Sequence, residues 1–233
     1  MMRASAIVVA AGSGLRLGAG TPKAFVPFGR STLLGAALRT ISAVTSIGEA
    51  VIAVPAGMET RARREVEAAG LQIPVKIVAG GAERQDSVRI ALALTSVEAE
   101  LVIVHDAARP LASVTMFEAC LEQAAATGAA IVAIPVADTL KRVAQDQNQD
   151  AIFETIPRAG LWQAQTPQAF RRRLLLDAHA RGAELGIVAT DDSELVEQTA
   201  ARVAVVPGSL LNLKITTADD LRLAEALAAE LLR

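Results

Sequence analysis

The chain has 233 residues, of which 52% are hydrophobic and 21% are charged, a length and composition that allow one α/β domain with a sizeable core. Its formal net charge of −2 gives no basic footprint for nucleic acid, and its one cysteine, Cys120, excludes an internal disulfide and stands in an apolar helical pattern typical of a core residue. Met1 leads directly into the first predicted strand and no apolar run could span a bilayer, so we expect a cytoplasmic protein without membrane contact.

Strands and helices alternate along the first part of the chain. Apolar runs predict strands at residues 6–9, 50–54, 75–78, 101–104 and 130–136. Helical patterns cover residues 32–42, 58–69, 83–94 and 115–127. All-apolar strands that alternate with helices predict an α/β fold, a Rossmann-like and mostly parallel sheet with helices on both faces. Ligands of such sheets bind beyond the carboxyl ends of the strands, so the loops at those ends are the candidate site.

The first of these loops runs from Ala10 to Lys23 and is rich in glycine and alanine. Small residues let backbone N–H groups approach an anion, and Arg16 and Lys23 add two cations. No Walker string G-x-x-x-x-G-K-[ST] occurs, and Leu17 stands where a dinucleotide fingerprint needs a third small residue. The loop therefore predicts a polyphosphate ligand, with an ordinary strand-to-helix connection as the alternative.

The third predicted strand is followed by a pair of glycines and then by a helix. Gly80 and Gly81 would let the backbone approach a base or ribose, and Ser87 lies one helical turn further on. The alternative is a glycine turn with ordinary helix capping.

The fourth predicted strand ends in the string His105 to Pro110. Asp106 could bind Mg²⁺ or a substrate hydroxyl, and Arg109 could bind phosphate. Alternatively, the two residues pair with each other and fix the turn. His105 and His179 are the two histidines, too few with one cysteine for a zinc site, and we interpret His105 as a structural residue.

The pattern changes after the fifth predicted strand. Residues 139–143 and 151–156 flank a polar tip, which predicts a projecting β-hairpin closed by Pro157 and Arg158. We see no linker or repeat, so we expect a single domain over residues 1–233 with an inserted arm at about 138–157.

The last third of the chain returns to the α/β pattern. Residues 161–168 predict a strand and turn, a helix follows to about residue 180, and residues 203–206 predict another strand. Asp191 is the expected N-cap of a helix, with Glu194 in the capping-box position. Residues 217–220 cap a final amphipathic helix.

Taken together, these strings resemble the 2-C-methyl-D-erythritol 4-phosphate cytidylyltransferase family of the non-mevalonate isoprenoid pathway. The first loop alone resembles the A-A-G-x-G-x-R…P-K signature of the wider sugar-nucleotide and polyol-phosphate nucleotidyltransferases. The strings that carry the closer resemblance are Gly80-Gly81 to Ser87, His105 to Pro110, Thr139, Pro157-Arg158, Gln165 to Gln168, Thr190 to Asp192 and Asn212 to Thr216. One departure is Ala82, where many members carry Asp. A backbone role there would be unaffected, whereas a side-chain role would leave nucleotide affinity lower.

The resemblance implies cytidylyl transfer from CTP to a polyol phosphate, with release of pyrophosphate and with Mg²⁺, or another divalent cation, bridging phosphate oxygens. Asp106 is the one candidate metal ligand. Catalytic roles would fall to Arg16, Lys23, Arg158 and Lys214. Nucleotide binding would fall to Ala10, Ala11, Gly12, Gly14, Gly80, Gly81, Ala82, Ser87 and Ala107. Substrate binding would fall to Asp106, Arg109, Thr139, Arg158, Thr166, Thr190 and Lys214.

The predicted hairpin also bears on assembly. A lone two-stranded hairpin is marginal in water, and this one carries Leu140, Val143, Ile152, Phe153 and Ile156. With the resemblance, this predicts a homodimer with interlocked arms, in which Arg158 serves the partner's site and Lys23 its own. Two alternatives to the main activity are a ribitol 5-phosphate cytidylyltransferase and a non-catalytic nucleotide-binding protein.

Overall fold

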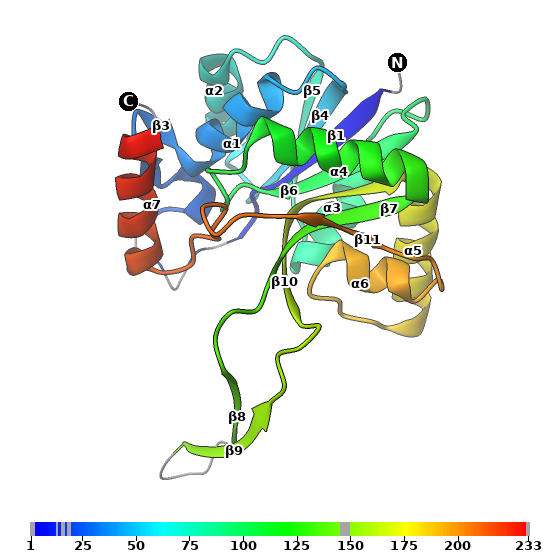
Figure 1. Cartoon of the computed structure of the whole chain (residues 1–233). Coiled ribbons are helices and arrows are strands. Elements are labelled where there is room, and N and C mark those ends of the chain that lie inside the picture. The colour runs from blue at the N-terminus through cyan, green and yellow to red at the C-terminus, as the bar shows by residue number, and fades with distance from the viewer. Residues whose placement is uncertain (1–2, 13, 15–16, 18–19, 145–149, 232–233) are drawn as a thin grey trace.

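The computed structural model describes residues 3–12, 14, 17, 20–144 and 150–231 (Figure 1). Arg16 and the tip of the predicted hairpin at 145–149 lie outside these residues. A seven-stranded sheet has the order β11-β7-β10-β6-β1-β4-β5. Its strands are β1 (Ala4–Val9), β4 (Ile47–Val54), β5 (Val75–Ala79), β6 (Leu101–Asp106), β7 (Ala129–Pro135), β10 (Trp162–Arg171) and β11 (Ala204–Pro207). Strand β10 is antiparallel to both neighbours and the other pairs are parallel, which confirms the mostly parallel sheet.

Helices cover both faces of this sheet (Figure 1). They are the short 3-10 turn η2 (Lys23–Phe25) and the α-helices α1 (Leu33–Ser42), α2 (Glu59–Ala69), α3 (Arg84–Ala93), α4 (Val114–Thr127), α5 (Arg172–Leu185), α6 (Asp192–Glu197) and α7 (Ala218–Leu231). Alternate side chains of β1 enter two different cores because successive residues of a strand point to opposite faces. Val8 packs in the core shared with α1, α2 and α4, and Ile7 packs in the core shared with α3, α5 and α6.

Local chemistry sets several helix starts. The Thr32 hydroxyl accepts a hydrogen bond from the N–H of Gly35 and begins α1, and Asp191 caps α6 as predicted. The Glu194 carboxylate, however, accepts from Thr190 N at 2.8 Å rather than from the cap residue, so the predicted capping box is displaced by one residue. Cys120 lies in the core, where burial raises the pKa of its thiol to about 12.

Strand β10 is a single ten-residue strand where the sequence predicted a strand and a turn. Its pairing with β7 shifts register between Ala164 and Gln168, and this irregular stretch contains Thr166. Because β10 lies between β6 and β7, the shift brings Thr166 beside the end of β6. The irregularity therefore helps to shape the edge of the sheet at which the strand-end loops meet.

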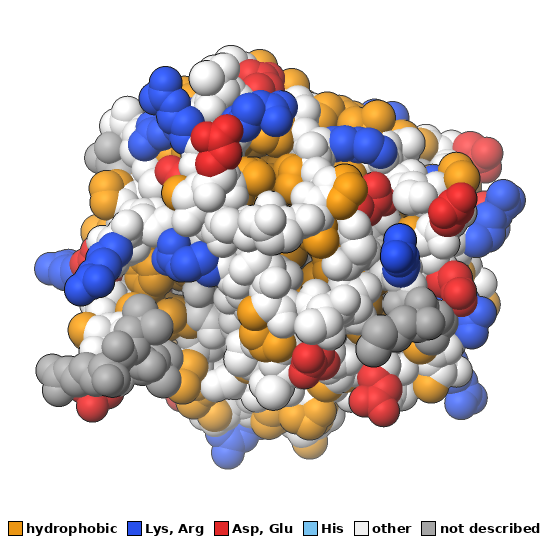
Figure 2. Space-filling model, turned by 90° about the horizontal axis from the view of Figure 1, so that it is seen from above, with side chains coloured by type: hydrophobic (Ala, Val, Ile, Leu, Met, Phe, Trp, Pro, Cys, Tyr) orange, Lys and Arg blue, Asp and Glu red, His pale blue; other side chains and the backbone are white. Residues whose placement is uncertain are grey.

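The arm is a separate two-stranded sheet of β8 (Leu140–Ala144) and β9 (Ala151–Ile156) that projects from the ends of β7 and β10 (Figure 1). This confirms the predicted hairpin. Figure 2 shows basic and acidic side chains interspersed over one face, with no extended basic surface among the described residues drawn there. Among the helices described, none combines the length and apolar character needed to cross a membrane. Two small strands, β2 (Pro27–Phe28) and β3 (Ser31–Thr32), pair with each other.

Candidate active site

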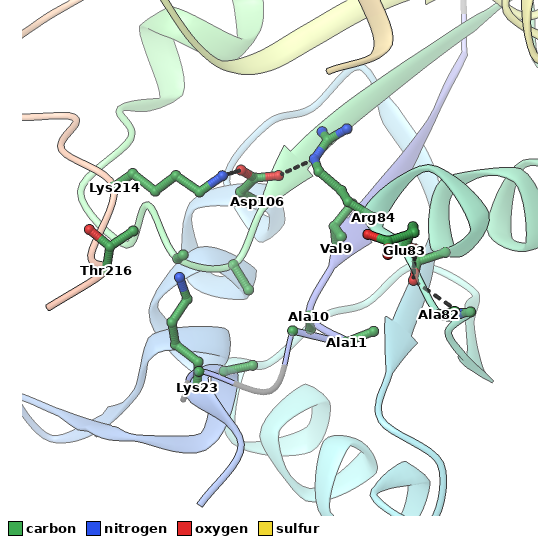
Figure 3. Close-up of a pocket in the computed structure, with 17 residues that line it drawn as sticks. Val9, Ala10, Ala11, Lys23, Ala82, Glu83, Arg84, Asp106, Lys214 and Thr216 are labelled. Carbon is green, nitrogen blue, oxygen red and sulfur yellow. Dashed lines mark hydrogen bonds and ion pairs between the residues drawn. The ribbon is translucent and has the colours of Figure 1, made fainter. Parts of the chain in front are cut away.

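A cavity of about 430 Å³ opens where the loops after β1 and β6 face the start of α3 (Figure 3). β1 and β6 are neighbouring parallel strands, so the loops that follow them leave the sheet at one edge. Eight residues predicted to bind the nucleotide line it: Ala10, Ala11, Gly12, Gly14, Gly81, Ala82, Ser87 and Ala107. Its volume and small-residue lining suit a nucleotide.

Two glycines allow close contacts in this wall. A Cβ at Gly80 would lie 2.4 Å from the Cβ of Ala11 and 2.6 Å from Oγ of Ser87, so Gly80 lies behind the lining and lets two loops touch. Gly14 has φ +69°, and a Cβ there would lie 2.6 Å from the Cβ of Lys23. Any larger residue at either position would push the loops apart.

The Ser87 hydroxyl is engaged by its own loop. It accepts from Gly81 N at 3.1 Å and donates to Glu83 O at 3.2 Å, and the residue is buried. Ser87 therefore fixes the position of the glycine turn, and its predicted contact with a nucleotide stays a prediction.

A second cavity of about 160 Å³ adjoins the first and shares Arg84, Asp106 and Lys214 with it. We call the larger cavity the nucleotide lobe and the smaller one the substrate lobe. Five residues predicted to bind the second substrate line the smaller lobe: Asp106, Arg109, Thr166, Thr190 and Lys214. Gln168 and Asp191, which sequence analysis did not assign, also line it.

An alternating row of charges crosses the boundary between the lobes (Figure 3). Lys214 Nζ lies 2.7 Å from Asp106 Oδ2, and Arg84 Nε lies 3.1 Å from Asp106 Oδ1. Burial alone would raise the pKa of Asp106, but the charges of Arg84 and Lys214 outweigh it and hold that pKa well below its usual range. Asp106 is thus a fixed carboxylate with both oxygens paired.

No ion pair joins the side chains of Arg109 and Asp106, so the structure does not support the alternative of a structural Asp–Arg pair. Its guanidinium donates instead to Asn212 O at 2.7 Å and to Ala164 O at 3.2 Å. Burial lowers the pKa of Arg109. Two carbonyls therefore engage most of the Arg109 guanidinium, and these bonds tie the 212–216 segment to β10. A contact between Arg109 and the substrate phosphate stays a prediction.

His105 and Thr166 form a buried hydrogen-bond chain behind the site. Thr166 Oγ1 accepts from Asp106 N at 3.0 Å and lies 3.0 Å from His105 Nδ1, while His105 Nε2 lies 3.2 Å from Arg109 O. A carbonyl can only accept, so Nε2 carries the ring proton and Nδ1 accepts from the threonine hydroxyl. Burial lowers the pKa of His105 to about 4, so it is neutral near pH 7, which agrees with a structural role.

Lys23 enters the nucleotide lobe from η2, opposite Lys214 (Figure 3). Its Nζ donates to Ile215 O at 2.8 Å, which links the first loop to the segment that carries Lys214. Two lysines far apart in sequence therefore line one cavity, and their catalytic roles stay predictions.

Thr139 and Arg158 lie outside both lobes. Both are exposed at the base of the arm, where the Arg158 guanidinium donates to Ala137 O. Within one chain the structure does not bring these two predicted residues to Lys23 and Lys214.

The residues that could hold a metal were tested on the same geometry. Asp106 has an ion-pair partner on each oxygen, and the described residues contain no cluster of three His, Cys, Asp or Glu side chains suited to a metal. Both oxygens of Asp106 are therefore engaged by side-chain cations in this structure, and a role for Asp106 as a metal ligand stays a prediction.

Sequence reasoning also missed Arg84 and Asp192. Arg84 Nη1 lies 2.8 Å from Asp192 Oδ2, and Asp192 is buried. Arg84 stands in the glycine string and Asp192 in the string that begins with Thr190, so both lay within the motifs, but no spacing showed that they would meet.

Comparisons with known proteins point to one family. The family model described as "IspD: 2-C-methyl-D-erythritol 4-phosphate cytidylyltransferase" matches residues 4–230. Proteins of that name from Deinococcus radiodurans and Salinibacter ruber are 46% and 42% identical, covering 97% and 95% of this chain and 89% and 91% of their own lengths. A crystal structure of the Thermus thermophilus protein of that name is 36% identical, with a TM-score of 0.80 over 98% of this chain and 100% of its own.

Proposed function

The chain belongs to the 2-C-methyl-D-erythritol 4-phosphate cytidylyltransferase family, and from that premise we propose how its residues divide the reaction. The enzyme transfers the cytidylyl group of CTP to 2-C-methyl-D-erythritol 4-phosphate, giving CDP-methylerythritol and pyrophosphate for isoprenoid precursors. The observation that carries our assignment is the convergence of Lys23 and Lys214 on one cavity lined by small residues.

In this reaction an oxygen of the substrate phosphate attacks the α-phosphorus of CTP. The bond from that phosphorus to the bridging oxygen breaks, and pyrophosphate leaves with the electron pair. Both reactants are anions, so positioned cations are the main requirement for catalysis. Lys23, together with Arg16 as the sequence predicts, stabilises charge that grows on the α-phosphate and the pyrophosphate.

Lys214 holds the attacking phosphate at the boundary between the two lobes. Its ammonium pairs with Asp106, yet its side chain is 41% exposed, so it has room to contact a ligand. Asp106, Arg109, Thr166 and Thr190 line the substrate lobe and would surround the polyol. The cytosine lies against the glycine turn at Gly81, which Gly80 supports from behind, so the base meets backbone there.

We assign the divalent cation to the nucleotide rather than to a protein site. Mg²⁺ is commonly held by phosphate oxygens and water with few protein ligands. Such a cation would neutralise phosphate charge, and it needs no cluster of acidic side chains on the chain.

The homodimer is the remaining part of the proposal. Ile152 and Phe153 are 66% and 72% exposed on the arm, and Trp162 at its base is 49% exposed. Exposed apolar side chains on a projecting hairpin support burial against a second arm. In that dimer, Thr139 and Arg158 would reach the partner's substrate lobe. A cytoplasmic location stays a prediction.

The direct test measures pyrophosphate release with each of four nucleoside triphosphates and several polyol phosphates. We expect turnover with CTP and methylerythritol phosphate, and much weaker turnover with UTP, ATP or GTP, because groups that bind the cytosine amino group would go unpaired. Equal use of CTP and ATP would contradict the base assignment. Preference for ribitol 5-phosphate would contradict the substrate assignment.

A further inference from the structure

The row of charges at the site continues into the protein past Arg84. Arg84 Nε donates to Asp106, and Arg84 Nη1 donates to Asp192 Oδ2 at 2.8 Å. On the far side, His179 Nε2 lies 3.2 Å from Asp192 Oδ1. Asp192 and His179 are 1% and 2% exposed, so this end of the row is sealed from water.

Arg84 bridges two carboxylates because a guanidinium is a rigid fork. Its Nε donates to Asp106 and its Nη1 donates to Asp192. The third nitrogen, Nη2, is buried with no partner among the described residues. Burial would lower the pKa of Arg84, but the charges of Asp192 and then Asp106 raise it, so it stays charged. A lysine at this position could reach one acid at a time.

The position of Arg84 decides how Asp106 meets Lys214. Arg84 takes Oδ1 of Asp106 and leaves Oδ2 for Lys214. If Asp192 lost its charge, a guanidinium with two unused donors would turn toward the remaining carboxylate and compete for Oδ2. Lys214, with a side chain 41% exposed, would then lose the partner that limits its rotation.

Asp192 also lies at a well-anchored place. It is the first residue of α6, and its neighbour Asp191 caps that helix and accepts from Gln168 Nε2 at 2.9 Å. Gln85 ties the preceding loop to α3 through Ala189 N and Ile187 O. The segment that carries Asp192 is thus tied to β10 and α3 at the start of α6.

We propose that Asp192 is a positioning residue for cytidylyl transfer, which holds Arg84 so that Asp106 keeps one oxygen for Lys214. The inference rests on the proposed role of Lys214. It predicts that Asp192 affects use of the polyol phosphate far more than binding of CTP, because Lys214 handles the attacking phosphate.

The test is a double-mutant cycle on the full chain, with Asp192→Asn and Lys214→Ala alone and combined. Asp192→Asn should lower kcat/KM for the polyol phosphate roughly 10- to 100-fold, the range seen when an outer residue that orients a site ligand is removed, and leave KM for CTP within about twofold. In the Lys214→Ala background the same change should have little further effect. Arg84→Lys should lower kcat/KM for the polyol phosphate as Asp192→Asn does. It replaces Asp192→Asn in the cycle if the Asp192→Asn protein fails to fold.

Glu49→Gln is the matched control, because Glu49 is a partly buried carboxylate near the start of β4 that accepts hydrogen bonds from Ser5 and Ser96. It should alter stability without changing either kinetic constant for the polyol phosphate. Equal losses from Asp192→Asn in both backgrounds would overturn the inference and leave the proposed function intact. If Lys214→Ala itself keeps normal turnover, the proposed function fails instead.

Discussion

The pocket and the arm differ in how far the side chains of one chain are paired or buried within that chain. In the pocket, polar groups from β6, α3, α6 and the 212–216 segment pair with one another, and Asp106 and Asp192 are buried with complete sets of partners. On the arm, Val143, Ile152 and Phe153 are 46%, 66% and 72% exposed. The described charges of the pocket find their partners within one chain, whereas the apolar side chains of the arm do not, and this contrast is the ground for the proposed dimer.

The largest effect should come from the pocket side, with Lys23→Ala. Losing a positioned charge contact to the transition state lowers turnover on the order of 100- to 1,000-fold, while KM for CTP should change little. Lys76→Ala is a matched control, since Lys76 also donates to a main-chain carbonyl, that of Leu94, but belongs to the edge strand β5. Steady-state kinetics showing near-normal turnover and only a raised KM would remove Lys23 from the catalytic set.

The next effect tests the arm side, with Phe153→Asp. A charge on a central apolar contact should weaken the dimer by about 2 kcal/mol or more, roughly 30-fold, and activity should fall as monomers appear in sedimentation. CTP binding, which depends on the pocket alone, should persist. Val97→Asp is the control, because Val97 is 84% exposed away from the arm. A Phe153→Asp protein that stays dimeric and fully active would contradict the role of the arm.

A third substitution tests whether the close packing at Gly80 shapes the nucleotide lobe. Gly80→Ala places a Cβ 2.4 Å from Ala11 and must push the glycine turn away from the first loop. We expect about tenfold weaker CTP binding by calorimetry, since overpacking costs about 1–3 kcal/mol. Gly48→Ala, whose Cβ would meet Arg3 at an ordinary 3.4 Å, should bind CTP normally. Normal CTP affinity in Gly80→Ala would show that this close approach does not shape the base site.

The last prediction leaves activity aside and concerns stability as the pH changes. Burial lowers the pKa of His105 from 6.5 to about 4, so between these values the unfolded chain takes up a proton that the folded chain does not. The free energy of unfolding should therefore fall as the pH falls from 6.5 to 4, by up to about 3 kcal/mol from this residue. The pKa values of Asp106 and Asp192 are lowered from 3.8, so the stability that these carboxylates contribute is lost mainly below about pH 5, at the lower end of this window.

Urea unfolding of the wild type and of His105→Gln, both in EDTA, separates this contribution. The variant should lose less stability than the wild type over the window. Parallel curves for the two proteins would show that His105 is not the titrating group.

Sequence alone predicted the sheet, its helices and the arm, because apolar strands and helical periodicity are local signals. The sequence also identified small residues at the nucleotide lobe. A glycine in a loop is a local signal that other groups can approach the backbone closely, and a Cβ at Gly14, Gly80 or Gly81 would indeed meet neighbouring atoms. The sequence did not predict that β10 enters the sheet between β6 and β7, because strand order depends on packing between distant segments.

The ion-pair and hydrogen-bond partners of the charged residues could not be predicted from the sequence either. Asp106 and Arg109 are three residues apart and suggested a pair, yet Asp106 pairs with Arg84 and Lys214, 22 and 108 residues away. Arg109 turns instead to the carbonyls of Ala164 and Asn212. Such choices depend on which groups share a buried space after folding, and local spacing does not contain that information.

The central claim, that each site combines the pocket of one chain with the arm of another, is tested most directly by mixing two inactive variants. Lys23→Ala and Arg158→Ala are unfolded, combined equally and refolded, and each is also refolded alone as a control. Random pairing of symmetric dimers places about half of the protein in heterodimers, each with one site that has both residues, so about a quarter of wild-type activity should return. If Arg158 acts within its own chain, every site keeps a defect, and the mixture will be no more active than the two variants alone.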